Sequence, residues 1–446
     1  MRSLEKLLIL ALAGALLAGD PWTLVLAIAA AAICVLHAFI EKPRWQMIPA
    51  YLSVAVLPAW LPANRIPPLV ALIVGMALAM GVAISFVLPV FALPEPGGPC
   101  AIGTETRQWT ALREDGAGGR RFSRPLTVQF WYPSDTRGGK CSLYRVNDAP
   151  GLKSHLRLVR THSFVNAALS GTAEKFPLIL FSPGWKGHLT QNTVQFEMLA
   201  SHGFIVVSIE HPRAEALPAD FDSSLEANLR GYDREVELRA GDIEFVINRL
   251  ESLEGNDAEG RFTGRLDLRR IGMFGFSFGG AVTAQACWRD RRLKAGLNLD
   301  GLLFGQAADA GVEQPFFFMS SDGALPAEQD LHDPDPKRRV HMRALDGDMK
   351  RIRKSLAQFG GYYLRIAGAN HSNFSDQPLY SPLRRLTGAG RMVPARAFQI
   401  VNDYTLAFFE HHLNEKPEPL LDAKMPRDAE ADFSRYLVGN EVEAIA

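Results

Sequence analysis

Three side chains in the second half of this 446-residue chain have the types and the order that nucleophilic ester chemistry requires. They are Ser277, Asp300 and His371, in that order along the chain. A serine hydroxyl is a poor nucleophile unless a base takes its proton and an acid holds that base in the correct tautomer. The order Ser, Asp, His is typical of sites in which the serine lies on a strand-to-helix elbow. We therefore predict that these three residues form a catalytic triad.

The residues around Ser277 support an elbow of this kind. The stretch Gly275-Phe276-Ser277-Phe278-Gly279 matches the G-x-S-x-G pattern, with apolar Ile271–Phe274 before it and a helix-compatible run after it. The positions two before and two after the serine need almost no side chain, because strand and helix approach closely there. A plain tight turn would match the pattern too, but the flanking strand and helix patterns favour the elbow.

The base and the acid are chosen by their places after predicted strands. His371 follows the strand Tyr362–Ala367 directly, whereas His202 and His211 precede the serine, which is the wrong order for the base. Asp300 ends the strand that follows the elbow, and Asp322 comes after the next strand. Both positions can supply the acid, and we favour Asp300.

An oxyanion formed at the ester needs hydrogen-bond donors that are fixed before the reaction. One predicted donor is the backbone N–H of Phe278, the residue after the nucleophile. The second is expected in the loop Ser182-Pro183-Gly184-Trp185. Since Pro183 has no N–H, we predict that Trp185 supplies this donor.

The elements that must position these groups indicate an α/β fold. Continuous apolar runs separated by helical patterns predict a mostly parallel sheet covered by helices on both faces. The expected strands are 176–182, 204–209, 271–274, 295–300, 315–320 and 362–367, with helices at 191–202, 230–254 and 395–413. An antiparallel pair is expected at 101–110 and 126–133, a helix near 152–165, and a charged surface helix or flexible cover at 334–356.

The first 93 residues differ from the rest in composition. Four apolar stretches, Leu4–Gly19, Trp22–Ile40, Trp45–Asn64 and Pro67–Leu93, predict a bundle of about four transmembrane helices. The second and fourth stretches are long enough to cross a bilayer. The third contains three prolines, and the first is short enough to be a signal peptide. We expect a transmembrane region at 1–93, a Pro/Gly linker at 94–99 and a catalytic domain at 100–446.

The sequence leaves open on which side of a bacterial-type inner membrane the catalytic domain lies. Arg2 and Lys6 favour a cytoplasmic N-terminus, and four crossings would leave the domain in the cytoplasm. A disulfide between Cys100 and Cys141 would argue for an oxidising compartment, although two free thiols are slightly favoured. The charge balance, with 48 basic and 48 acidic residues, gives no support for nucleic-acid binding.

Several stretches in order resemble the platelet-activating-factor acetylhydrolase family of the plasma and intracellular type, a branch of the α/β-hydrolases. They are Phe181–Gly184, Leu199–Val206 with Glu210-His211, Gly275–Gly280, Leu299–Gly301, Gln314–Phe318 and His371–Asp376, within about 100–413. The resemblance implies an α/β-hydrolase fold, an acid on the strand after the elbow, and hydrolysis of short or oxidised acyl esters through an acyl-enzyme without a metal. This chain has Phe276 and Pro183 where the family often has His.

These observations predict a membrane-anchored serine ester hydrolase that needs no cofactor or metal. Its expected partners are an ester or phospholipid-like substrate and the bilayer, and nothing in the sequence fixes its oligomeric state. The alternatives are a broad carboxylesterase or polyester hydrolase of the same fold, and a non-catalytic membrane scaffold built on it.

Overall fold

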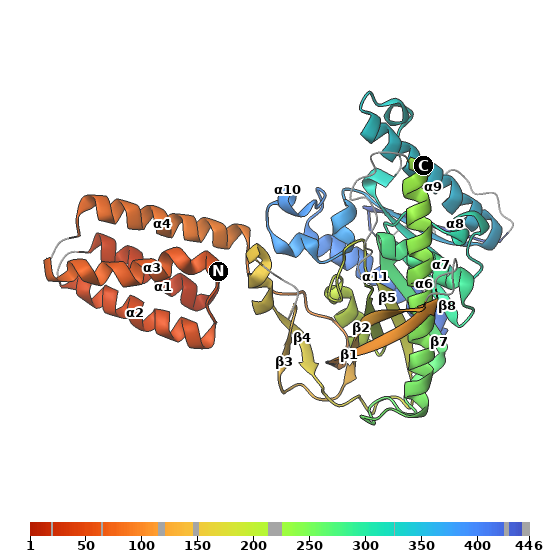
Figure 1. Cartoon of the computed structure of the whole chain (residues 1–446), viewed down its shortest axis with the longest axis horizontal. Helices are drawn as coiled ribbons and strands as arrows, with labels where there is room; N and C mark the ends of the chain where they lie inside the picture. The colour runs from red at the N-terminus through yellow and green to blue at the C-terminus, as the bar shows by residue number, and fades with distance from the viewer. Residues whose placement is uncertain are drawn as a thin grey trace. The chain divides into compact units, whose positions relative to one another are not determined.

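The computed structural model describes residues 1–18, 21–63, 66–114, 121–145, 151–212, 225–324, 326–422 and 428–438. The chain folds as two compact units (Figure 1). The first consists of Met1–Leu93 together with two later segments, Leu143–Thr161 and Pro378–Thr387. The second consists of Pro94–Ser142, His162–Gln377 and Gly388–Ala446.

The first unit is built on four apolar helices. They are α1 (Ser3–Leu17), α2 (Trp22–Ile40), α3 (Ile48–Val56) and α4 (Pro68–Val87), with 3₁₀ turns at Trp45–Met47 and Leu57–Ala63. Their common core contains Leu8, Leu12, Met47, Ala50 and Leu78. The outer faces of α2 and α4 leave large apolar side chains exposed, such as Ile28, Phe39, Leu72 and Met76.

The expected bundle of about four transmembrane helices is not confirmed. Within the described residues, only α2 and α4, of 19 and 20 residues, are long and apolar enough to cross a membrane. Helix α1 has 15 residues, which is below the minimum for a span. Helix α3 ends at Val56 because the prolines at 58 and 62 cannot continue an α-helix, and the chain goes on as a 3₁₀ turn.

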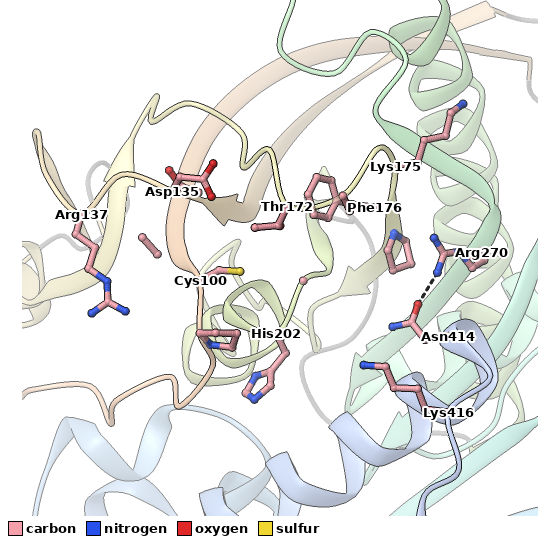
Figure 2. Close-up of a pocket in the computed structure, with 16 residues that line it drawn as sticks. Cys100, Asp135, Arg137, Thr172, Lys175, Phe176, His202, Arg270, Asn414 and Lys416 are labelled. Carbon is pink, nitrogen blue, oxygen red and sulfur yellow. Dashed lines mark hydrogen bonds between the residues drawn. The ribbon is translucent and has the colours of Figure 1, made fainter.

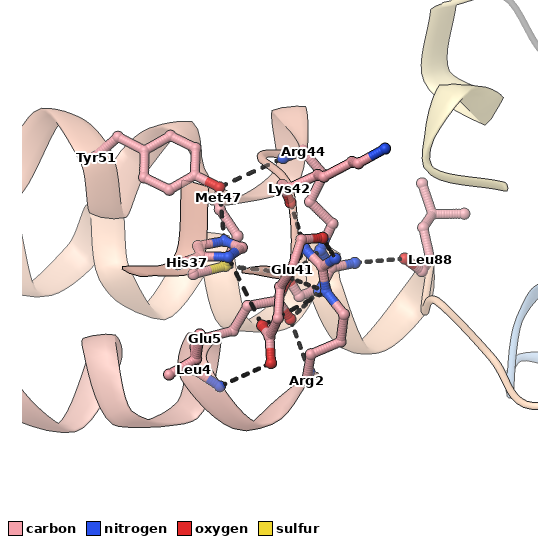
Figure 3. Close-up of polar contacts among 11 residues, drawn as sticks. Arg2, Leu4, Glu5, His37, Glu41, Lys42, Arg44, Met47, Tyr51 and Leu88 are labelled. Atoms are coloured by element: carbon pink, nitrogen blue, oxygen red, sulfur yellow. Dashed lines mark hydrogen bonds and ion pairs between the residues drawn. The ribbon is translucent and has the colours of Figure 1, made fainter. Parts of the chain in front are cut away.

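One end of the helical unit holds a cluster of ion pairs (Figure 3). The Arg44 guanidinium donates to both oxygens of Glu5, from Nε at 2.7 Å and from Nη2 at 2.8 Å. Arg2 donates to the same carboxylate at 2.8 Å, and the Leu4 N–H donates to Glu41 at 3.0 Å. These contacts bring the start of α1, the end of α2 and the residues before α3 to the same end.

The last helix of this unit ends there too, because Arg44 Nη1 donates to the carbonyl of Leu88 at 3.2 Å. His37 adds a hydrogen bond of 2.9 Å from Nε2 to the Tyr51 hydroxyl. Glu5, His37 and Glu41 place one possible metal-ligand atom each within 4.8 Å of one another. The two arginines already occupy both Glu5 oxygens, so ion pairing accounts for this group without a metal.

The second unit is organised around an 11-stranded sheet with the strand order β11-β10-β9-β8-β7-β5-β6-β2-β1-β4-β3. The strands from β10 to β6 in this order run parallel, and β2, β1 and β11 add antiparallel pairs at the two sides. The strand bounds are β1 (Ala101–Glu114), β2 (Arg121–Ser134), β3 (Cys141–Leu143), β4 (Arg160–Val165), β5 (Phe176–Ser182), β6 (Ile205–Glu210), β7 (Leu266–Phe276), β8 (Leu293–Leu299), β9 (Phe316–Ser321), β10 (Gly361–Ile366) and β11 (Ala431–Tyr436).

Helices cover both faces of this sheet, as the continuous apolar strands require. One face packs against α5 (Thr193–Ser201) and α11 (Pro394–Asn414). The other packs against α6 (Leu225–Gly255), α7 (Phe278–Arg289) and α9 (Pro336–Phe359). The short helices are α8 (Gln306–Ala310), α10 (Arg384–Thr387) and α12 (Pro419–Asp422). The predicted α/β fold with a mostly parallel sheet is confirmed.

Two local predictions are wrong. The expected helix near 152–165 is a 3₁₀ helix over Gly151–Leu158 followed by strand β4. The polar strand residues are held by Glu197, which accepts hydrogen bonds from the His162 N–H and the Ser163 hydroxyl. The strand at 362–367 is not the last one, because the half-polar β11 pairs with it. None of the four cysteines, all of which the structure describes, forms a disulfide, so Cys100 and Cys141 are not bonded to each other.

Candidate active site

The serine elbow has the backbone strain that its motif predicts. Ser277 lies between β7 and α7 with φ 57° and ψ −125°, a conformation rarely adopted by residues with side chains. A Cβ atom on Gly275 would lie 2.0 Å from the Gly279 carbonyl oxygen, and one on Gly279 would lie 1.9 Å from that of Ser182. Both glycines are therefore required for strand and helix to approach this closely.

The carboxylate of Asp300 and the imidazole of His371, the predicted acid and base, are in hydrogen-bond contact. Asp300 Oδ2 lies 2.7 Å from His371 Nδ1, and its Oδ1 accepts the Ser321 N–H at 2.6 Å. The second contact fixes the carboxylate, so its other oxygen can hold one tautomer of the imidazole. With Nδ1 protonated toward Asp300, Nε2 of His371 is free to act as a base.

The alternative acid, Asp322, makes different contacts. Its Oδ2 accepts the N–H of Gly368 at 3.1 Å, and its own N–H donates to the Ala369 carbonyl. These bonds hold the loop that precedes His371. Asp322 thus supports the position of the histidine through the backbone, while the imidazole itself is bonded to Asp300.

Ser277, Asp300 and His371 all line one cavity of about 530 Å³. The Phe276 ring, next to the serine, lies against the His371 ring with a centroid separation of 4.7 Å. No described residue makes a hydrogen bond to the Ser277 hydroxyl. The serine–histidine bond is therefore not formed in this structure, as is common for catalytic groups without a substrate.

The two backbone N–H groups predicted to bind an oxyanion, those of Trp185 and Phe278, belong to residues that line the same cavity as Ser277. Phe278 is the first residue of α7, so its N–H has no partner within the helix. In the loop after β5, Pro183 has no N–H, and the Gly184 N–H donates to Gln191 Oε1 at 2.9 Å. The next N–H, that of Trp185, makes no hydrogen bond to any described residue. The two predicted donors are thus the ones that remain available.

A buried arginine supports both donor residues, and sequence reasoning missed it. The Arg239 guanidinium lies over the rings of Trp185 and Phe278, at 5.3 Å and 4.9 Å from their centroids. These two rings are 5.1 Å apart in an edge-on arrangement. Glu235, one turn earlier on α6, accepts from Arg239 Nε at 2.8 Å and compensates the buried charge.

A second chain of polar groups lies entirely inside the protein beneath the same loop. Ser182 Oγ is 3.1 Å from His211 Nε2, and His211 Nδ1 is 2.9 Å from Asp242 Oδ2. Arg124 donates to both oxygens of Asp242 at 2.8 and 2.7 Å. Burial lowers the pKa of His211 to about 4. The neutral histidine ties the end of β5 to α6, and neither Ser182 nor His211 is among the described residues that line the cavity.

One part of the cavity wall was not predicted from the sequence. Helix α9 supplies Leu345, Asp348, Met349 and Ile352, and the rings of Tyr232 and Phe304 complete the apolar part. The spacing of Leu345, Met349, Ile352 and Leu356 marks an amphipathic helix, which the sequence could have shown. The many charged residues of this segment predicted a surface helix or a flexible cover instead.

A larger hollow, of about 670 Å³, lies at the other ends of the strands (Figure 2). It is lined by Lys175, Arg270 and Lys416, among others. These three cations already have partners, in Glu254, Asp267 and Glu410 respectively. The hollow holds no acid–base pair comparable to that of Asp300 and His371, so its size alone does not make it the reactive site.

Comparison with known proteins places this arrangement in a family. Residues 151–241 and 251–419 match the family described as platelet-activating factor acetylhydrolase, isoform II. The chain belongs to this family. The matched residues include the elbow, Asp300 and His371. They also include Asp376, whose carboxylate accepts the Thr193 N–H at 2.7 Å at the start of α5.

Individual relatives are distant. The chain is 27% identical over 274 residues to platelet-activating factor acetylhydrolase of Cavia porcellus, covering 54% of this chain and 58% of that protein. It is 25% identical to a probable 1-alkyl-2-acetylglycerophosphocholine esterase of Arthroderma benhamiae, covering 59% and 67%. The chain thus spans little more than half of the length of the first relative.

A solved structure has the same fold. The ferulic acid esterase from Streptomyces cinnamoneus is 26% identical, with a TM-score of 0.59. The match covers 77% of this chain and 99% of the esterase. Because the match covers nearly all of the esterase chain, it confirms the α/β-hydrolase fold of this protein.

Proposed function

We propose that this protein is a membrane-anchored serine ester hydrolase. Ser277 attacks the ester carbonyl, and His371 takes the serine proton and later gives it to the leaving alcohol. Asp300 orients the imidazole, and the N–H groups of Trp185 and Phe278 stabilise the oxyanion. An acyl-enzyme forms and is then hydrolysed by water that His371 activates. The observation that carries the proposal is the 2.7 Å contact between Asp300 and His371 in the cavity that holds the strained serine.

The membership in the acetylhydrolase family supports the reaction type. The cavity of about 530 Å³ is within the range of pockets that bind drug-sized ligands, and an acetyl group would fill little of it. The volume has room for the alcohol part of a lipid ester beside a short acyl group, which supports short-chain or lipid acyl esters as substrates.

The test is labelling of the full-length protein with a fluorophosphonate probe. The wild type should become labelled and should hydrolyse a p-nitrophenyl ester, whereas Ser277→Ala should do neither. Ser320→Ala is a matched control, because it removes another hydroxyl from the same cavity and should leave labelling intact. Absence of labelling in the folded wild type would favour the non-catalytic scaffold.

The helical unit supports insertion into a membrane with the catalytic unit on the cytoplasmic side. The start of α1 and the ends of α2 and α4 meet in the ion-pair cluster, so the chain leaves the unit on the side where it begins. Because α2 and α4 both end there, α3 and the 3₁₀ turn Leu57–Ala63 return the chain towards the opposite end of the unit before α4 begins. Arg2, Lys6, Lys42 and Arg44 lie in the segments at this end, and such positive charge favours the cytoplasm.

Reporter fusions test this orientation. Green fluorescent protein at the C-terminus should fluoresce in bacterial cells, and alkaline phosphatase at the same position should be inactive. The opposite pattern would contradict the cytoplasmic assignment. Recovery of the protein without detergent after a high-pH wash would contradict membrane insertion itself.

A further inference from the structure

The catalytic cavity contains one ionisable group that the proposed mechanism does not use. Asp348 of α9 lines the wall together with Met349 and Ile352, and only 5% of its surface is exposed. The rings of Tyr232 and Phe304 line the same cavity and stack at a centroid separation of 5.1 Å. An acidic side chain in such apolar surroundings is costly unless its oxygens have hydrogen-bond partners.

Only one oxygen of Asp348 has a partner among the described residues. Its Oδ1 accepts the Leu303 N–H at 2.7 Å, and this bond holds α9 against the loop that follows β8. Oδ2 makes no hydrogen bond within the described part of the chain. A neutral Asn would satisfy Leu303 equally well without a buried acid, so the bond to Leu303 does not account for a carboxyl group here.

Burial raises the pKa of Asp348 to about 7. Arg351, on the same helix, opposes this shift of the pKa only in part, and its guanidinium pairs with Asp309 on α8 at 3.8 Å. Near neutral pH, Oδ2 can therefore either donate or accept a hydrogen bond. A hydroxyl group is the partner that suits both states, because it too both donates and accepts.

We propose that Oδ2 of Asp348 binds a hydroxyl group on an aromatic arm of the ester substrate. The rings of Tyr232, Phe278 and Phe304 provide faces and edges against which a planar arm can pack. An arm without the hydroxyl group leaves the buried carboxyl unpaired, and this difference selects the hydroxylated ester. The inference rests on the proposed esterase function of Ser277 and adds to it a substrate class, hydroxyaryl esters.

The test compares matched substrates on the full-length enzyme. One set contains methyl 3-phenylpropanoate and its analogues with a hydroxyl group at the meta or para ring position. A second set places the same arms on the alcohol side, as acetates of 2-phenylethanol and its ring-hydroxylated forms. In at least one set, kcat/KM should be about tenfold higher for a hydroxylated member than for its parent, the effect of one well-formed hydrogen bond to a buried acid.

Two variants assign the preference to Asp348. Asp348→Val keeps the approximate size and removes both oxygens, so the preference should disappear or reverse. Asp348→Asn keeps the acceptor for Leu303, and the preference should fall to about threefold. Asp346→Asn is the matched control, since Asp346 lies on the same helix, pairs with Lys350 and does not line the cavity. It should keep the wild-type ratio.

Each comparison is a ratio of two kcat/KM values measured on the same protein. Partial unfolding of a variant lowers both values equally, so the ratio does not change. A wild type that turns over hydroxylated and parent esters equally in both sets would overturn the inference, as would an unchanged preference in Asp348→Val. Either result leaves the esterase assignment standing if Ser277 is still labelled by fluorophosphonate. Loss of labelling and of all hydrolysis in the wild type would instead overturn the function on which the inference rests.

Discussion

Asp300 reaches His371 across 71 residues of sequence with a single hydrogen bond of 2.7 Å, and a backbone N–H holds the other oxygen of the same carboxylate. Asp300 itself has φ 53°, a left-handed conformation that aims its side chain out of the end of β8. Gly301 makes this turn possible, because a Cβ atom there would lie 2.0 Å from the Ser277 carbonyl oxygen. The backbone that follows Asp300 is thus packed directly against the backbone of Ser277.

Replacement of Asp300 by Asn should lower kcat by roughly 10⁴-fold with little change in KM. The amide preserves the shape of the pair but holds the wrong imidazole tautomer, which leaves His371 unable to accept the serine proton. Steady-state hydrolysis of a p-nitrophenyl ester measures the effect. Asp322→Asn serves as the control and should retain activity within a few-fold, because Asp322 contacts the backbone of Gly368. Equal losses in the two variants would contradict the assignment of the acid.

Replacement of Gly279 by Ala should abolish fluorophosphonate labelling. The new Cβ atom would lie 1.9 Å from the carbonyl oxygen of Ser182, and backbone atoms on both sides leave no room for it. The elbow would have to open, which displaces Ser277 and lowers the apparent Tm by several degrees. Gly255→Ala is the control, since a Cβ atom there meets nothing within 4 Å. Normal labelling of Gly279→Ala would show that the elbow is looser than described.

Replacement of Arg239 by Met should lower kcat about tenfold and leave KM nearly unchanged. The guanidinium lies against Trp185 and Phe278, so its loss lets the two predicted oxyanion donors drift by a fraction of an ångström. Arg239→Lys should recover part of kcat, because an ammonium group can still lie near the rings. Arg249→Met removes a comparable arginine from the ring of Trp109, where it is exposed, and should leave kcat unchanged. An increase in KM alone would argue against a role in positioning the donors.

The sequence could predict which strand ends meet at the cavity. Ser277, Asp300 and His371 each come after a strongly apolar run, and the carboxyl ends of parallel strands meet at one edge of the sheet, where the structure brings all three to one cavity. The proposed donors Trp185 and Phe278 were chosen from the missing N–H of Pro183 and from the elbow motif. These residues needed only local pattern and strand order.

The remaining parts depend on tertiary packing, which local pattern does not contain. Arg239 acts through a face of α6 that meets the elbow only after the sheet has formed. In the sequence, Asp348 is one of many charged residues in its segment. Only the packing of α9 along the cavity distinguishes it from the others. Strands β4 and β11 are half-polar because they lie near the sheet margins, so they lack the apolar runs that identify the central strands.

The neutral His211 at the centre of the buried chain should make stability depend on pH. Its pKa is lowered from 6.5 to about 4 by burial, so the unfolded chain binds a proton that the folded chain excludes. Stability should therefore fall as the pH decreases from about 6.5 towards 4, by at most about 3 kcal/mol at 1.36 kcal/mol per pKa unit. Asp242 stays charged over this range, because Arg124 and His211 hold its pKa below its usual value.

The variant His211→Asn isolates this contribution. Asn keeps a donor for Asp242 but does not titrate, so the apparent Tm of the variant should change less between pH 6.5 and 4.5 than that of the wild type. His412, whose pKa burial also lowers to about 4, is present in both proteins and cancels in the comparison. Thermal unfolding of the full-length protein in detergent, followed at several pH values, gives the two curves. Parallel curves would mean that His211 does not govern the acid sensitivity, whereas curves that diverge below pH 6.5 and converge above it would identify the buried histidine as its source.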